Sequence, residues 1–289
     1  MPLVTGRVVR DAWEGGYAVP ACSVHSADMV DAVVEEAVQQ QAPVLLQIGQ
    51  RAIRHGQMSA LAARIRRIAG EASVPVGIHL DHCHEVSQVV QALHAGVTSC
   101  MIDASSLPLE DNVRLTRQVV EICHYAGVPV EGELGTIQGV EDDVSVADEA
   151  AVFTDPEVAA AYVERTGVDA LAVAVGSAHG MYRREPRLDL ERLRAIRAAV
   201  SVPLVLHGGS GIPMGALHAA IARGIAKINF DTELRLAFME GMAAAAPSHP
   251  EDPWAVLASG KERLRAAVRE KIGHCRAAQR AAPHPAART

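Results

Sequence analysis

Short apolar runs alternate with longer helical patterns along most of the chain, and this alternation limits the fold more than any other feature. Each run that predicts a strand is followed by a segment with apolar residues at helical spacing. The predicted strands are 17–24, 43–48, 74–80, 98–102, 129–133, 170–175, 203–206 and 225–230. Eight parallel strands, each returning through a helix, predict an α/β fold of the TIM (β/α)8 barrel type.

Two regions break this rhythm. Residues 134–154 show no usable periodicity and include an acidic run at 141–143, which is typical of a lid or a binding loop. After residue 253 the pattern predicts one or two extra helices over 254–272, and we expect residues 277–289 to form a frayed tail. With 289 residues, 49% of them apolar, the chain can bury one large core, so residues 1–289 are expected to form a single barrel domain.

The composition argues against two kinds of partner. A formal net charge of −7, the lack of a basic run and the small number of aromatic residues argue against a nucleic-acid surface. No apolar run approaches the roughly 18 residues of a membrane span. The five cysteines are scattered without C-x-x-C spacing, so we expect reduced thiols in a cytoplasmic protein.

Three histidines follow three different predicted strands. His82 comes after the third strand with Asp81 beside it, His179 comes after the sixth and His207 after the seventh, so the topology should bring them to the C-terminal mouth of the barrel. One such histidine is more often a hydrogen-bonded structural residue, but three at equivalent strand ends favour a metal centre. Three imidazoles with an open fourth position suit catalytic zinc.

Further acidic residues are predicted near the same mouth. Asp103 and Glu133 end the fourth and fifth strands, where they could hold a second or displaced metal ion; ion-paired or solvated carboxylates explain them equally well. Glu131 shares a strand face with Glu133 and could serve instead. Glu141 lies in the irregular segment, where a carboxylate on a lid could move a proton, although an exposed loop acid is the simpler interpretation.

Two adjacent loops predict phosphate recognition. Helix N-termini after strands seven and eight are the usual phosphate site of a TIM barrel. The glycine run after strand seven could equally be a turn if it stood alone, but its position favours phosphate. The predicted binding residues are Gly208, Gly209, Ser210, Asn229, Phe230, Asp231 and Thr232.

Five motifs, in this order along the chain, are similar to those of a known family. Because of these motifs the chain resembles the class II, metal-dependent ketose-bisphosphate aldolases, and the resemblance extends from about residue 17 to residue 272. Residues 165–182 look closest to the tagatose-bisphosphate aldolase branch. The motifs are His79-Leu80-Asp81-His82, Met101-Ile102-Asp103, Glu131-Gly132-Glu133-Leu134-Gly135, Val175-Gly176-Ser177-Ala178-His179-Gly180 and Lys227-Ile228-Asn229.

The resemblance implies a lyase of carbohydrate metabolism, as in glycolysis, that reversibly cleaves a ketose bisphosphate to dihydroxyacetone phosphate and an aldehyde such as glyceraldehyde 3-phosphate. It implies that the three histidines bind Zn²⁺, which polarises the ketone. Asp81 would exchange a proton with the C4 hydroxyl, and Glu141 would handle the proton at the carbon that becomes C3 of dihydroxyacetone phosphate.

The resemblance also assigns the remaining positions. Gly180 and the two phosphate loops would hold dihydroxyacetone phosphate. Asp103 and Glu133 match positions where such enzymes bind a second cation, divalent or monovalent, or hold the displaced zinc. The family and the extra C-terminal helices suggest a homodimer or homotetramer.

One departure leaves the sugar open. Where relatives usually have Phe-Asn at the end of the first strand, this chain has Cys22-Ser23, which removes an amide donor beside the substrate; Arg51 or Arg54 could compensate. Fructose 1,6-bisphosphate or another phosphorylated ketose therefore remains an alternative to the tagatose isomer.

Other chemistries are less well supported. A Schiff-base aldolase needs a lysine at the barrel mouth, but Lys227 lies at the start of the last strand and only two other lysines exist. A barrel that binds sugar phosphates without turnover is an alternative of another class. A zinc hydrolase with Asp81 as its base would leave both phosphate loops unexplained.

Overall fold

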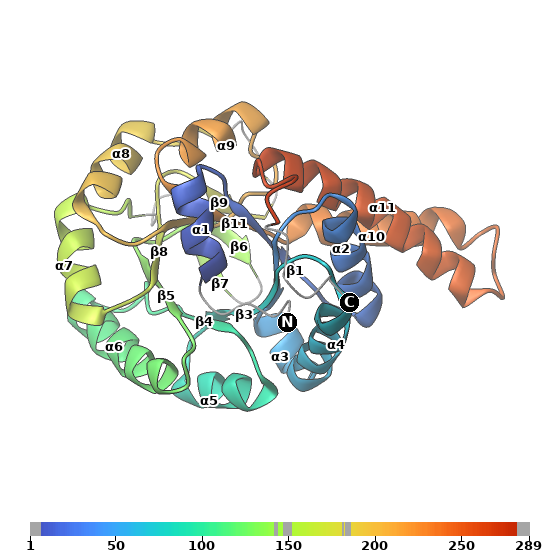
Figure 1. Cartoon of the computed structure of the whole chain (residues 1–289), viewed down its shortest axis with the longest axis horizontal. Helices are drawn as coiled ribbons and strands as arrows, with labels where there is room; N and C mark the ends of the chain where they lie inside the picture. Colours follow the sequence, from blue (N-terminus) through green and yellow to red (C-terminus); the bar gives the residue numbers. More distant parts are fainter. Residues whose placement is uncertain (1–6, 142–143, 147–151, 181, 183–185, 282–289) are drawn as a thin grey trace, which may run out of the picture.

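Eight parallel strands form a closed barrel surrounded by helices in a computed structural model of the chain, which describes residues 7–141, 144–146, 152–180, 182 and 186–281 (Figure 1). The barrel strands are β1 (Val19–Ser23), β2 (Val44–Ile48), β3 (Val76–Cys83), β4 (Ser99–Ile102), β5 (Val130–Leu134), β8 (Ala170–Val173), β10 (Leu204–Leu206) and β11 (Ile225–Phe230). Strand β1 pairs with both β2 and β11, which closes the barrel. The predicted TIM barrel is confirmed.

Several of the helices that return between these strands begin or end at residues typical of helix caps. They are α2 (Ala27–Gln39), α4 (Met58–Glu71), α5 (Val86–Ala95), α6 (Leu109–Tyr125), α7 (Pro156–Thr166), α8 (Leu190–Ala199), α9 (Met214–Ile221) and α10 (Thr232–Ala245). The hydroxyl of Ser26 accepts a hydrogen bond from the backbone N–H of Met29, and the carboxylates of Asp155 and Asp189 cap α7 and α8 in the same way. Gly96 ends α5 in the left-handed conformation.

Two short helices were not predicted. Helix α1 (Arg7–Gly15) buries Val8 and Ala12, and Val9 and Trp13 are partly buried beside them. Apolar residues at helical spacing were therefore present in the sequence, although no helix was predicted there. It lies over the end of the barrel where the strands begin (Figure 1). Helix α3 (Gln50–Arg54) directly follows β2, where the sequence predicted a loop.

Part of the irregular segment 134–154 forms strands. Strands β6 (Gln138–Glu141) and β7 (Val144–Val146) pair antiparallel, and β6 also pairs with the two-residue strand β9 (Ala178–His179). These strands are too short to show an alternating pattern in the sequence. The hairpin therefore lies beside the segment that carries His179.

The C-terminal part packs against the barrel and also extends away from it. Helix α11 (Pro253–His274) is one continuous helix, and it forms with α10 an arm that projects from the barrel (Figure 1). Residues 277–281, which we expected to be frayed, contact the end of α2: the backbone N–H groups of Gln279 and Ala281 donate to the carbonyls of Gln40 and Gln41. No helix among the described residues is long and apolar enough to cross a bilayer.

The barrel interior contains polar side chains in place of many of the branched aliphatic residues that usually fill such a barrel. Lys227, Glu131 and His79 contact one another across it and are almost completely buried. Because side chains alternate along a strand, residues two positions further on share the inner face. These residues are Asn229, Glu133 and Asp81, nearer the C-terminal mouth.

Candidate active site

An irregularity in β3 turns two neighbouring polar side chains into the barrel. The pairing of β3 with β4 shifts between Leu80 and Cys83, and His82 has a positive φ of 44°. In a regular strand Asp81 and His82 would point to opposite faces. A positive φ at a residue with a side chain costs on the order of 1–3 kcal/mol, and such strain is tolerated mainly at functional positions. The bulge therefore brings both side chains to one site.

Three histidines converge at this mouth. The ring centroid of His82 lies 4.7 Å from that of His207 and 5.2 Å from that of His179, and the last two are 6.0 Å apart. One nitrogen from each ring lies within 4.8 Å of the other two, and all three groups are buried. This arrangement could hold a metal ion.

Two carboxylates fix which ring nitrogens face the centre. Nδ1 of His82 lies 2.9 Å from Oδ2 of Asp103, and Nε2 of His207 lies 2.8 Å from Oε1 of Glu131. A carboxylate accepts, so those two nitrogens carry protons, and Nε2 of His82 and Nδ1 of His207 are left facing each other. These two atoms are 3.0 Å apart, so the two rings could bind one metal ion. Carboxylates commonly orient metal-binding histidines in this way.

The electrostatics of the site favour a positive charge at that point. Burial lowers the pKa of His82, but the charges of Asp81 and Asp103 outweigh it and raise the pKa to about 10. Burial and the neighbouring imidazoles hold the pKa of His179 well below its usual range. A proton or a metal ion could supply the positive charge, and a neutral imidazole such as His179 is ready to bind a metal.

A second group that could hold a cation adjoins the first. It consists of His82, Asp103 and Glu133, all buried. Oε2 of Glu133 accepts no hydrogen bond among the described residues, although it lies 3.6 Å from Nδ1 of His207. Burial raises the pKa of Glu133 well above its usual range, and the charge of Asp103 raises it further. An orphaned buried carboxylate oxygen beside the histidines fits a cation ligand.

Asp81 lies beside the histidines and is held by Asn229. The side-chain amide of Asn229 donates to Oδ1 of Asp81 at 3.2 Å, and both residues are buried. A buried carboxylate with one anchored oxygen, next to a possible metal, is suited to proton transfer.

Comparisons with known proteins agree with this geometry. The model of the family described as fructose-bisphosphate aldolase class-II matches residues 4–280. The chain belongs to this family. The crystal structure of the YdjI aldolase from Escherichia coli K12 is 35% identical, covers 97% of this chain and 100% of its own, and superposes with a TM-score of 0.86. Membership makes the chain an aldolase, a lyase that cleaves a ketose bisphosphate.

Two other solved structures are similar. A putative fructose-1,6-biphosphate aldolase from Coccidioides immitis is 30% identical, covers 94% of this chain and 96% of its own, and has a TM-score of 0.88. A fructose-bisphosphate aldolase from Campylobacter jejuni covers 96% of both chains at 22% identity with a TM-score of 0.80, which supports the fold alone.

In this class II aldolase, Glu141 lies at the end of the hairpin beside the metal-binding candidates. Gly139 is paired with His179, and Glu141 ends β6 two residues further on. At about 3.3 Å per residue, its backbone lies roughly 7 Å along the strand from that pair. The side chain of Glu141 is outside the described part of the structure.

The first predicted phosphate loop is shaped by close packing as well as by its sequence. Gly208 has a φ of 64°, and a Cβ there would collide with the backbone oxygen of Ala178. A Cβ on Gly209 would lie 2.5 Å from Ile228. These glycines are therefore required for packing, whether or not their N–H groups bind an anion.

The same packing involves a tyrosine that the sequence reasoning did not single out. The hydroxyl of Tyr182 donates to the carbonyl of Gly208 at 2.9 Å and accepts from the N–H of Ala178 at 2.7 Å, so it joins the loop after β10 to the segment that carries His179. Gly180, in that segment, has a φ of 85°.

The residues of the second predicted loop, at the start of α10, have different contacts. The carboxylate of Asp231 lies 2.8 Å from Nε2 of His25, a residue that precedes α2. Phe230 is completely buried and packs against the core, so only its backbone would meet a ligand. Thr232 is the first residue of α10, so its backbone N–H is at the N-terminus of that helix.

Ser210, from the loop after β10, contacts the same helix. It is buried, and its hydroxyl accepts a hydrogen bond from the backbone N–H of Glu233 at 3.4 Å.

Proposed function

We propose that the chain is a zinc-dependent aldolase that cleaves a ketose bisphosphate of the tagatose 1,6-bisphosphate type to dihydroxyacetone phosphate and an aldehyde such as glyceraldehyde 3-phosphate. One observation carries the metal part of this proposal: Nε2 of His82 and Nδ1 of His207 face each other at 3.0 Å beside His179, and carboxylates orient both rings. Zinc, when bound by these three residues, supplies a Lewis acid that polarises the substrate carbonyl. Asp103 and Glu133 would hold a second or displaced cation.

The proton transfers belong to two carboxylates. Asn229 anchors Oδ1 of Asp81, which leaves Oδ2 to take the proton from the C4 hydroxyl as the C3–C4 bond breaks. Glu141 would then return a proton to C3 of dihydroxyacetone phosphate, because the β6–β7 hairpin places its backbone near His179. Burial of Asp81 strengthens its interactions with the reacting groups by excluding water.

Substrate phosphate would bind at the two helix starts after β10 and β11. The residues proposed for it are Gly180, Gly208, Gly209, Ser210, Asn229, Phe230, Asp231 and Thr232. The residues around the starts of α9 and α10 are supported by their position near helix N-termini at this mouth, where backbone N–H groups favour an anion. Gly180 is supported by its place directly after His179.

The aldehyde half of the substrate would meet the end of β1 and β2. Ser23 lies in register with Gln47, which in turn pairs with His79 on the next strand. Both side-chain amide atoms of Gln47 are buried without a hydrogen-bond partner among the described residues. Leaving a buried amide without a hydrogen-bond partner costs roughly 1–3 kcal/mol, so the amide of Gln47 would bind a ligand hydroxyl and replace the donor lost at Ser23.

A coupled assay with tagatose 1,6-bisphosphate and fructose 1,6-bisphosphate tests the proposal. We expect cleavage of both to require zinc and to be faster for the tagatose isomer. The two sugars differ only in the configuration at C4, where Asp81 would act. Faster cleavage of fructose 1,6-bisphosphate would overturn the sugar assignment and leave the zinc chemistry intact.

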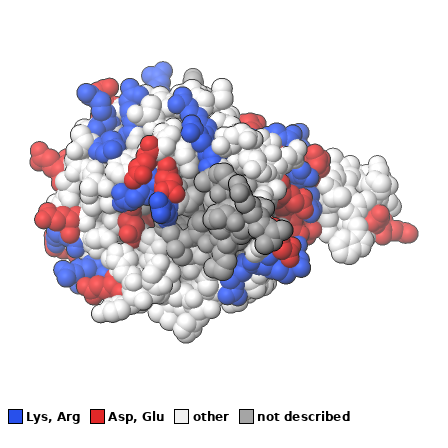
Figure 2. Space-filling model, in the orientation of Figure 1, with Lys and Arg blue, Asp and Glu red and all other residues white. Residues whose placement is uncertain are grey.

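We also propose that the enzyme is a cytoplasmic homodimer or homotetramer that associates through the arm of α10 and α11. On the face shown in Figure 2, the outer part of the arm is largely uncharged. Leu236, Met239 and Trp254 are 39%, 55% and 77% exposed on these helices. Methionine and tryptophan are enriched at the centres of interfaces. Light scattering should show an oligomer that Trp254→Ser weakens; a monomeric wild-type protein would contradict this.

A further inference from the structure

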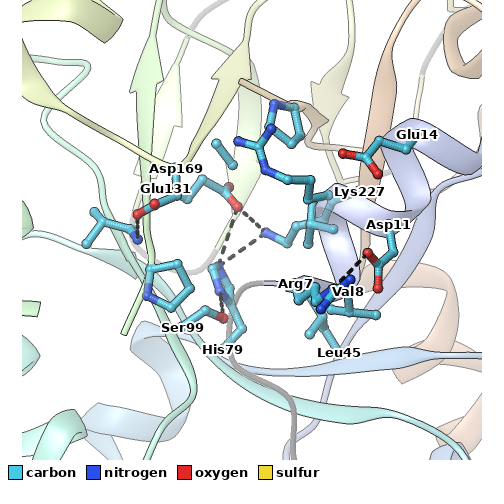
Figure 3. Close-up of a pocket in the computed structure, with 16 residues that line it drawn as sticks. Arg7, Val8, Asp11, Glu14, Leu45, His79, Ser99, Glu131, Asp169 and Lys227 are labelled. Atoms are coloured by element: carbon cyan, nitrogen blue, oxygen red, sulfur yellow. Dashed lines mark hydrogen bonds and ion pairs between the residues drawn. The ribbon is translucent and has the colours of Figure 1, made fainter. Parts of the chain in front are cut away.

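Lys227 lies below the proposed metal site, at the end of the barrel where the strands begin. Its ammonium donates to Oε2 of Glu131 at 2.7 Å and to Nε2 of His79 at 3.2 Å (Figure 3). Lys227 is 1% exposed, and its two partners are 4% and 1% exposed. A cavity of about 440 Å³, lined by residues of α1 and by all three of these side chains, lies at this end of the barrel, away from the mouth. Lys227 is therefore at the opposite end of the barrel from the proposed substrate site.

Glu131 connects the ammonium to a proposed metal ligand. While Oε2 accepts from Lys227, Oε1 lies 2.8 Å from Nε2 of His207. With both oxygens engaged, the carboxylate is fixed in orientation and must accept from His207. The proton of His207 is thereby held on Nε2, and Nδ1 is presented to the metal position.

His79 is the second partner of the ammonium. Because Lys227 donates to its Nε2, the imidazole carries its proton on Nδ1, which lies 2.7 Å from the hydroxyl of Ser99. Nε2 of His79 lies 3.7 Å from Oδ1 of Asp81 without a proton to give it. The ammonium therefore determines the tautomer of His79 directly and that of His207 through Glu131.

Stability alone does not readily explain why Lys227, Glu131 and His79 are buried together inside the barrel. Burying an ammonium and a carboxylate has a desolvation cost that hydrophobic residues of the same volume would avoid. TIM barrels usually fill these inner positions with valine, isoleucine and leucine. Retaining three polar residues that end on a proposed metal ligand indicates a role in the site.

We propose that Lys227 is a positioning residue that fixes the tautomer and orientation of His207 through Glu131, and so sets the metal affinity of the site. The inference rests on the proposed zinc site. It differs from the use of lysine in Schiff-base aldolases, because here the ammonium acts on the protein and forms no bond to the substrate.

The test compares zinc affinity, measured by chelator competition, and the visible spectrum of the cobalt-substituted protein. Substitution of a residue that orients a metal ligand typically weakens binding roughly 10- to 100-fold. We expect Lys227→Met to lose affinity in this range and to change the cobalt spectrum. The matched control is Lys271→Met, which removes an ammonium that is also buried, on a residue 3% exposed, and ion-paired, with Glu233 at 2.7 Å. The control should keep the wild-type affinity.

The outcomes separate the inference from the proposed function. Unchanged affinity and spectrum in Lys227→Met would overturn the inference, and a lower melting temperature alone would show a merely structural role. If Lys227→Met does not fold, Glu131→Gln decides: its amide can donate to His207 and select the wrong tautomer, so wild-type affinity in that variant overturns the inference. If the wild-type protein binds no zinc, the proposed function itself fails.

Discussion

Replacing Asp103 by asparagine tests whether the carboxylates orient the metal ligands. In the wild-type structure Nδ1 of His82 lies 2.9 Å from the carboxylate of Asp103. Asparagine has the same size as aspartate and keeps an oxygen near this nitrogen, but it removes the negative charge. Loss of such a partner typically weakens metal binding roughly 10- to 100-fold, which corresponds to about 1.4–2.7 kcal/mol. The measurement is competition between the protein and a chelator of known zinc affinity.

The control for this substitution is Asp155→Asn. Asp155 also accepts two hydrogen bonds, from backbone N–H groups at the start of α7, but it is exposed, and asparagine caps helices about as well as aspartate. Zinc affinity should stay at the wild-type value in the control. Equal affinities in Asp103→Asn and wild type would refute the reasoning.

The change of zinc affinity with pH is a second test of the interaction between Asp103 and His82. Burial lowers the pKa of His82 but Asp81 and Asp103 raise it to about 10, so in the metal-free protein a proton occupies this ring at neutral pH. That proton must leave before a metal binds, so affinity should rise about tenfold per pH unit between roughly pH 6 and 8. Asp103→Asn lowers this pKa and should flatten the rise. Wild-type affinity that does not change with pH would contradict the argument.

The raised pKa of His82 also determines how the stability of the metal-free protein changes with pH. The pKa of His82 in the folded, metal-free protein lies above its ordinary value of 6.5. The stabilisation is therefore fully present below about pH 6.5 and is lost as the pH rises towards 10. Denaturant melts of the metal-free protein across this window should show declining stability, with a smaller decline in Asp103→Asn.

Two further substitutions separate metal binding from proton transfer. His207→Ala should abolish zinc retention, measured by metal analysis after dialysis, because it removes one of three converging nitrogens; a full equivalent of retained zinc would contradict its role. Glu141→Ala should keep zinc but slow the exchange of the dihydroxyacetone phosphate proton with solvent, followed by NMR, and exchange at the wild-type rate would remove Glu141 from the mechanism.

The sequence predicted the barrel because its strands and helices carry strong, repeated signals. Every barrel strand contains buried apolar residues, and capping residues such as Ser26 and Asp189 mark helix starts. The β6–β7 hairpin was missed because its strands are too short to produce a period. Helix α1 was missed although Val8, Val9, Ala12 and Trp13 are at helical spacing. The positions of both elements are set by contacts with distant parts of the barrel, which the local sequence does not show.

The site was predicted at the level of topology but not of contacts. Strand ends of one barrel must meet, so the convergence of His82, His179 and His207 could be expected from their order alone. The bulge that turns His82 inward could not, because alternation predicts the opposite face. Likewise, Glu131 and Glu133 share a face in the sequence, but only the structure shows that Glu131 contacts His207 and Lys227.

The most direct test of the account is aldolase activity on tagatose 1,6-bisphosphate before chelation, after complete removal of metal and after addition of one equivalent of zinc. We expect cleavage to dihydroxyacetone phosphate, its loss on chelation and its recovery with zinc. Recovery should fail in His207→Ala, whose protein keeps the barrel but lacks one of the converging nitrogens. Undiminished cleavage by protein verified to be free of metal would contradict the central claim.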